Sequence, residues 1–353
     1  MIEQNDLKAA VSSGLLTEKQ AATLLSFAHS RKGARENLAV GDEPFELFKG
    51  FNEIFIVVGL IILAFGWYGV TGLSLGTQIV DLQTYAVTVT GISAFVLWLI
   101  SEYFVRHRRM VAPAIVLSMM FAGNAAFGFI ASMAEVFMIG QGDYASIPFP
   151  MVLATLALLV YWWRFRVPFA LAMIAVGLFV TAIIFAAAQG GEIRDPSDLF
   201  LLSAGGPFAW ITLALGLAVF AVAMMFDMSD PHRVTRRSAN GFWLHVVAAP
   251  ALINTIALSL IEQDAMSILL LVLGFFAIVA IIIDRRSFLI TAIGYVVSVS
   301  GSIFDGSGIA MTVLILGICI LLLGALWEKI RAAILQLLRG VLPLNRLPPV
   351  LSN

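Results

Sequence analysis

The sequence predicts an all-α, polytopic membrane protein of about ten transmembrane helices, and three observations support this fold class. Hydrophobic residues make up 60% of the 353-residue chain and charged residues only 12%, against roughly 45–50% and about 25% in soluble domains. The apolar residues form continuous runs, each close to the length of about 20 residues with which a helix crosses a bilayer. Basic residues gather in every second gap between these runs. We therefore expect lipid, rather than water, around most of the chain.

The apolar runs predict helices joined by short linkers, so that consecutive spans form antiparallel hairpins. Their apolarity is continuous, whereas the strands of a membrane barrel alternate at every second residue. A helix also satisfies its own backbone hydrogen bonds within lipid. The ten predicted spans, with ends defined to a few residues, are 54–75, 84–101, 110–131, 147–163, 167–188, 207–226, 241–261, 266–283, 287–304 and 309–327.

The basic residues predict the orientation, because lysine and arginine stay in the cytoplasmic short loops of membrane proteins. If the N-terminus is cytoplasmic, 20 of the 21 basic residues fall on the cytoplasmic side, and Arg194 is the exception. The loops on the other side carry mainly acidic residues. An error of one span would break this alternation, so the count and the orientation support each other. Both termini are predicted to be cytoplasmic.

The spans divide the chain into three parts: residues 1–53, the bundle 54–327 and the C-terminal residues 328–353. The first part is predicted to be a helical hairpin, whose second helix begins with a capping box at Thr17 and Gln20. Two short helices bury too little apolar surface to be stable alone. The hairpin is therefore expected to dock, either on a cytoplasmic protein partner or as a cap on the bundle.

The C-terminal part is predicted to be amphipathic. Ile330, Ile334 and Leu337 share one face of a helix, and Arg331 lies off that face. This pattern fits a helix lying in the membrane interface, or a continuation of the tenth span beyond the bilayer.

The N-terminal segment carries a pattern formed by Leu7, Ala10, Val11, Gly14, Leu15, Leu16, Thr17, Gln20 and Ala21. This pattern, followed by a string of spans, resembles a bacterial family of predicted multi-pass inner-membrane proteins, built around domain of unknown function 2157. The family has no assigned activity, so the resemblance implies only a location in the bacterial inner membrane.

Composition and motifs exclude several classes of function. A net charge of −1 argues against a nucleic-acid partner. The single cysteine, Cys319, can form neither an internal disulfide nor a metal site. No phosphate-binding loop or paired metal ligands are present, so no cofactor is predicted. The oligomeric state is not indicated.

The predicted membrane interior offers few polar groups. No span carries an aspartate, glutamate, lysine or arginine near its middle, where a charge costs about 3 kcal/mol or more. This absence argues against a pump that carries ions on a carboxylate. The candidate functional residues are Glu53 at the start of the first span, Asn124 in the third, and His245, Pro250 and Asn254 in the seventh.

Each candidate has two interpretations. Pro250 removes a backbone donor and precedes a stripe of small residues, so the seventh span either packs closely or lines a cavity at a kink. His245 is a hydrogen-bonded residue near the headgroups or part of a proton relay. Asn254 is nine residues away, on the opposite helix face. Glu53 favours a helix N-terminus through the helix dipole, or takes part in gating.

Three functions fit these residues to different degrees. The first is a transporter or facilitator of a small or amphipathic solute, which predicts a polar cavity near the midplane, reached by Asn124, Pro250 or Asn254. The second is a scaffold or sensor that recruits a cytoplasmic partner through residues 1–53. An intramembrane enzyme fits least, since it would require His245 in a pocket beside a carboxylate such as Glu53 or Asp227.

The longest loop on the outer side spans residues 189–206. Asp195 and Asp198 are expected to cap a short helix there, over residues 199–203.

Overall fold

A computed structural model describes residues 10–11, 13–17, 20, 51–77, 82–135, 144–191, 193, 195–231, 233, 236–285, 308–340 and 343–348. The chain forms two units: residues 1–46 with 353, and residues 47–352. In the first unit, the Thr17 Oγ1 accepts the Gln20 N–H at 3.3 Å and the Thr17 N–H donates to the Gln20 Oε1 at 3.0 Å. The predicted capping box is therefore present. Most of the predicted hairpin lies outside the described residues.

The second unit is built of helices, and the described residues contain no β-strand. A π-helical turn, η2 (Glu102–His107), extends α4. The α-helices are α3 (Phe51–Thr77), α4 (Leu82–Ser101), α5 (Ala112–Met133), α7 (Pro148–Phe165), α8 (Pro168–Ala188), α9 (Phe208–Ser229), α10 (Arg236–Glu262), α11 (Met266–Ile283) and α13 (Gly308–Leu337).

The predicted fold class is confirmed. The eight helices from α3 to α11 are long and apolar enough to cross a membrane, and they match the first eight predicted spans. The predicted span 287–304 lies outside the described residues. The predicted span 309–327 falls within α13, which continues without a break to Leu337. The amphipathic segment is thus a continuation of the last helix, one of the two arrangements that the sequence allowed.

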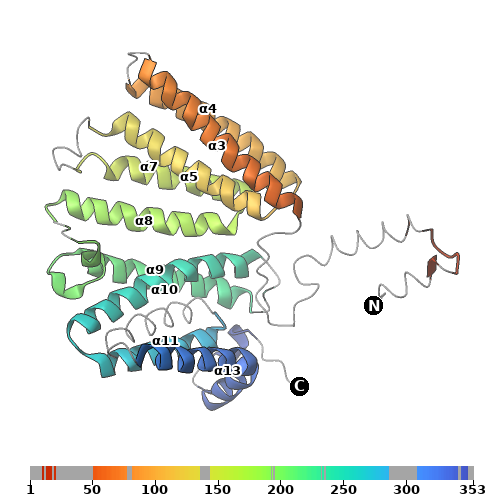
Figure 1. Ribbon diagram of the computed structural model, residues 1–353, viewed down its shortest axis with the longest axis vertical. Helices are drawn as coiled ribbons and strands as arrows, with labels where there is room; N and C mark the ends of the chain where they lie inside the picture. The colour runs from red at the N-terminus through yellow and green to blue at the C-terminus, as the bar shows by residue number, and fades with distance from the viewer. Residues whose placement is uncertain are drawn as a thin grey trace. The chain divides into compact units, whose positions relative to one another are not determined.

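Successive helices run antiparallel (Figure 1), and the most extensive contact between two described helices is that of α9 with α10. α5 contacts α3, α4, α7 and α8, whereas α10 contacts α8, α9 and α11. Of the eight candidate spans, α10 is the most buried and α3 the least. Large apolar side chains such as Phe65 and Leu271 are about three-quarters exposed, at 76% and 74%. In water this exposure would be costly, and it fits a surface covered by lipid.

The turns at one end of the bundle share a backbone feature. Arg109, Arg166, Arg233 and Asp284 each follow a helix that arrives at this end, and each has a positive φ, between 53° and 56°. Few residues other than glycine adopt this left-handed conformation. We call this end, where α4, α7, α9 and α11 terminate, the basic end.

Candidate functional site

The candidate functional site is a buried group of charged side chains at the basic end, centred on Asp227. Asp227 lies two residues before the end of α9 and is only 7% exposed. Arg285, which follows α11, donates to both carboxylate oxygens, from Nη2 to Oδ1 at 2.6 Å and from Nε to Oδ2 at 3.0 Å. This two-pronged geometry is the strongest arrangement of an arginine and a carboxylate.

α10 supplies the other partners of this pair. The His245 Nε2 lies 2.9 Å from the Asp227 Oδ2, and because an ionised carboxylate only accepts, this nitrogen carries the proton. The Ser238 carbonyl oxygen accepts a second hydrogen bond from the Arg285 Nη2 at 2.9 Å. Gly241 leaves room for the Asp227 carboxylate beside α10, because a Cβ at position 241 would overlap it. Ser238, Gly241 and His245 share one face of α10.

A second ion pair continues the group toward α13. The Arg233 Nη1 lies 2.9 Å from the Asp284 Oδ2, and its Nη2 donates to the Asp284 carbonyl oxygen at 2.6 Å. The Trp327 Nε1 on α13 donates to the other carboxylate oxygen, Oδ1, at 2.7 Å. Arg331, one turn further along α13, donates to the Ile281 carbonyl oxygen at 3.2 Å. The end of α13 is thereby held against the end of α11.

We call these two ion pairs, together with the residues that hydrogen-bond to their charged groups, the basic-end network. Its two carboxylates and two guanidinium groups balance each other in charge. Burying an ion costs several kcal/mol, and breaking a buried pair by removing one partner costs roughly 3–5 kcal/mol. The network therefore stabilises the packing of α9, α10, α11 and α13 against one another at the basic end. Its members are Asp227, Arg233, Ser238, His245, Asp284, Arg285 and Trp327.

Two candidates from the sequence lie away from this network, in contacts between helices. Asn124 is 2% exposed, and its Nδ2 donates to the Thr90 carbonyl oxygen of α4 at 3.0 Å. Glu53 is 4% exposed, and its Oε2 accepts the Ala112 N–H at 3.2 Å. Glu53 lies in the first turn of α3, as expected, but the backbone group that it caps begins α5.

Pro250 and Asn254 are half-buried on α10, which continues as a helix through the proline. The adjacent stripe of small residues is packed. Thr255 is fully buried, and the Ser259 Oγ accepts the Leu202 N–H at 3.0 Å. A Cβ on Gly216 of α9 would lie 3.1 Å from the Ala251 Cβ. The stripe therefore forms the close contact between α9 and α10, as the packing interpretation proposes.

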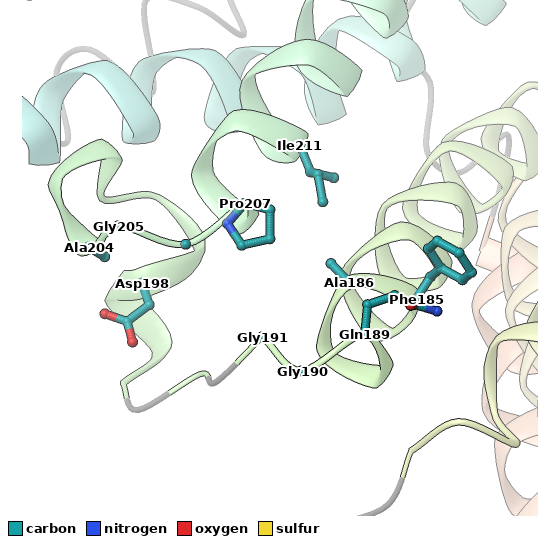
Figure 2. A pocket seen from close by; sticks show the side chains of 11 residues that line it. Phe185, Ala186, Gln189, Gly190, Gly191, Asp198, Ala204, Gly205, Pro207 and Ile211 are labelled. Carbon is teal, nitrogen blue, oxygen red and sulfur yellow. The ribbon is translucent and has the colours of Figure 1, made fainter.

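A cavity of about 850 Å³ lies at the other end of the bundle, between the end of α8 and the start of α9 (Figure 2). None of the five candidates is among the described residues that line it. The loop beside it forms two 3₁₀ turns, η3 (Pro196–Leu199) and η4 (Leu202–Ala204). The prediction of a single helix over residues 199–203 is therefore wrong, but the predicted capping by Asp195 and Asp198 is present: the two residues form a capping box on η3, in which the Asp195 N–H donates to the Asp198 Oδ2 at 3.2 Å. The chain instead extends at Leu201, and Gly205 ends the second turn with a φ of 73°.

Sequence reasoning missed most of the basic-end network. Arg233 and Arg285 were counted as loop residues that set the orientation, and Asp284 was not considered. Asp227 was named only as a partner that an enzyme would require for His245. A usable signal was present: Asp227 and Asp284 are acidic residues at the end of the spans where basic residues gather, which indicates pairing.

The fold and this network define an integral helical membrane protein with a buried ionic network at one end. Comparisons of the chain with protein-family models, curated proteins and solved structures found no match. The resemblance carried by residues 7–21 therefore stays a prediction.

Proposed function

We propose that this protein is a transporter or facilitator of a small amphipathic solute, and that the basic-end network is its cytoplasmic gate. One observation carries the proposal: α9 borders a cavity at its start, and at its other end Asp227 is held by Arg285 and by His245 of α10 in a buried ionic contact. A passage that is open on one side and shut on the other is what alternating access requires. The charge pattern of the loops supports a cytoplasmic position for the basic end.

The two ends are connected through these helices. α9 begins beside the cavity, at Pro207 and Ile211, and ends at the network with Asp227. α10 begins at the network and reaches Ser259, which accepts a hydrogen bond from Leu202 in the loop next to the cavity. A movement of α9 relative to α10 would therefore change both ends at once.

Opening requires separation of the tight contact between Gly216 and Ala251 and exposure of Thr255. The ion pairs suit such a movement. In the closed state each charge is stabilised by its partner, and in an open state water would solvate the separated ions. Packed elements that have two arrangements are the usual basis of switching in proteins.

Thiol labelling can test the gate without knowledge of the solute. Cys319 is the one cysteine of the chain, so Cys319→Ser gives a cysteine-free background, into which Thr255→Cys places a buried thiol. Inside-out and right-side-out vesicles are treated with a membrane-impermeant maleimide. We expect slow labelling from the basic side, and labelling at least tenfold faster when Arg285→Gln is added. Size-exclusion chromatography confirms that each variant is folded.

Glu102→Gln is the matched control. Glu102 also forms an ion pair with an arginine at the basic end, 2.6 Å from the Arg164 Nη2, but about 30% exposed. Its loss should leave labelling of Thr255→Cys unchanged. If Arg285→Gln prevents folding, Asp227→Asn replaces it, since the amide retains one acceptor oxygen. Equal labelling rates in all folded variants would refute the gate.

The alternative is a scaffold or sensor that recruits a partner through residues 1–53. The observation that favours it is the packed stripe on α10, where Thr255 is fully buried. A scaffold needs no passage between α9 and α10, and it predicts no labelling of Thr255→Cys from either side.

A further inference from the structure

We propose that the first half of the bundle, from α3 to α7, binds the phosphate group of an anionic membrane lipid at the basic end, between Arg106 of η2 and Arg164 of α7. These residues lie outside the basic-end network, so the inference goes beyond the proposed gate and does not depend on it. The partner is a component of the bilayer rather than a transported solute.

The two halves of the bundle differ in how their arginines are neutralised at this end. Residues 102–111 and 164–167 of the first half contain five arginines and one acidic residue, Glu102. Residues 227–237 and 284–286 of the second half contain five arginines and three aspartates, and two of those arginines are buried in the basic-end network. The exposed arginines of the first half are Arg106, Arg108, Arg109 and Arg166. The first half therefore carries the larger surplus of positive charge, and most of it is on the surface.

Within this surplus, Glu102 brings two arginines together. The Arg164 Nη2 lies 2.6 Å from the Glu102 Oε1, and the Arg106 Nη1 lies 3.5 Å from the Glu102 Oε2. A guanidinium group has five N–H donors, and these contacts use one nitrogen of each group. Two cations around one carboxylate leave one unit of positive charge, together with donors for further acceptor oxygens. Planar guanidinium groups match the paired oxygens of a phosphate, so the cluster suits a singly charged phosphodiester.

The backbone at this cluster has an unusual conformation. The acidic residue and one of the arginines belong to η2, a π-helical turn in which the Arg108 N–H donates to the Tyr103 carbonyl oxygen at 2.9 Å. Such turns are rare and are frequently found at functional sites. Directly before η2, the Ser101 Oγ lies 2.9 Å from the hydroxyl oxygen of Tyr161 on α7. The end of α4 is thereby fixed beside α7 at the level where the two arginines meet.

An exposed apolar row on α7 leads to the cluster. Val152, Leu156, Val160 and Trp163 are exposed and follow one another at intervals of three or four residues, so they lie along one side of the helix. Arg164 lies one turn beyond Val160. At 1.5 Å per residue, the distance from Val152 to Arg164 is about 18 Å, close to the roughly 15 Å of hydrocarbon in one leaflet of a bilayer. The row therefore has the length of an acyl chain and ends at a cation.

The surroundings favour a lipid over a free phosphate ion. Trp163 and Tyr103 are both exposed beside the arginines, and such aromatic side chains gather at the level of the lipid headgroups. Arginines near a membrane surface attract anionic lipids. A free phosphate ion would use the guanidinium groups but not the apolar row, whereas a lipid uses both.

Native mass spectrometry of the full chain, released from a non-ionic detergent, tests the site with two lipids that share the same dioleoyl chains. One is phosphatidylglycerol, whose headgroup is anionic, and the other is phosphatidylcholine, whose headgroup is neutral overall. The measured quantity is the ratio of their dissociation constants for the first bound lipid. We expect phosphatidylglycerol to bind at least about fivefold more tightly, as about 1 kcal/mol for one net charge near a membrane surface gives.

Arg164→Gln and Arg106→Gln should each bring this ratio close to one, because either substitution leaves a single arginine that is neutralised by Glu102. Neither arginine is buried, so the variants should remain folded, which size-exclusion chromatography checks. Arg236→Gln is the matched control, since it removes an exposed arginine at the start of α10, at the same end of the second half. It should change the ratio by less than about twofold, because salt screens exposed charges away from the phosphate.

Excess inorganic phosphate distinguishes a lipid from a free anion. It should not displace phosphatidylglycerol, because it lacks the acyl chains that lie along the apolar row. Displacement would assign the arginines to a soluble anion and overturn the lipid site. A ratio that survives both Arg164→Gln and Arg106→Gln, or that falls equally in Arg236→Gln, would also overturn it, since the preference would then come from the general positive charge of the basic end.

Discussion

Each half of the bundle has an ion pair between a carboxylate and an arginine at the basic end, and the two pairs differ in burial. In the first half, Glu102 after α4 pairs with Arg164 at the end of α7; in the second, Asp227 at the end of α9 pairs with Arg285 after α11. Both pairs have an N–O distance of 2.6 Å. The side chains of the first pair are 29% and 30% exposed, and those of the second 8% and 1%.

This difference in burial decides what each pair can do. An exposed pair contributes about 0–1 kcal/mol, because water solvates both ions when they separate. In a buried pair, loss of one partner leaves the other ion without water, and the cost rises to roughly 3–5 kcal/mol. The first pair is therefore a weak surface contact, whereas the second can hold helices in one of two states.

The largest expected effect comes from Asp227→Ala. It removes the carboxylate that Arg285 and His245 share, and leaves a buried guanidinium without its counter-ion. We expect a loss of about 3–5 kcal/mol in the free energy of unfolding, measured by denaturant unfolding in detergent micelles. A loss below about 1 kcal/mol would show that water enters the network and that burial does not separate the two halves.

A smaller effect is expected from Gly241→Ala, because the added Cβ overlaps the Asp227 carboxylate. Such overpacking costs about 1–3 kcal/mol, again measured as the free energy of unfolding. Gly274→Ala in α11 is the control, since a Cβ there meets no described atom within 4 Å. If the two substitutions have the same effect, close packing at Gly241 does not position the carboxylate.

The smallest effect is expected from Glu102→Ala. Its pair with Arg164 is partly exposed, so the free energy of unfolding should fall by at most about 1 kcal/mol. Raising the salt concentration should reduce this difference further, because salt screens exposed charges. An effect as large as that of Asp227→Ala would contradict the comparison.

The sequence was enough to predict the helices but not their contacts. Apolar runs and basic residues identified the eight described spans because both depend only on local composition. Glu53 shows where this reasoning stops: its charge indicated a helix N-terminus, yet the N–H that it caps belongs to Ala112, 59 positions along the chain.

The candidate site was predicted less well for the same physical reason. Arg285 has the sequence pattern of any arginine in a short loop, and its burial depends on how closely α9, α10 and α11 approach each other. Gly216 and Gly241 permit that approach, but a glycine in an apolar helix gives no sign of which neighbour it contacts. His245 and Asp227 could be considered together only as a hypothetical pair.

The most direct test of the gate is the ratio of labelling rates at Thr255→Cys when the buried pair and the exposed pair are broken in turn. With the reagent on the side of the basic end, we expect Arg285→Gln to label at least tenfold faster than Glu102→Gln, which should match the unaltered network. A ratio near one, in proteins shown to be folded, would contradict the account and leave the basic-end network as a fixed structural contact.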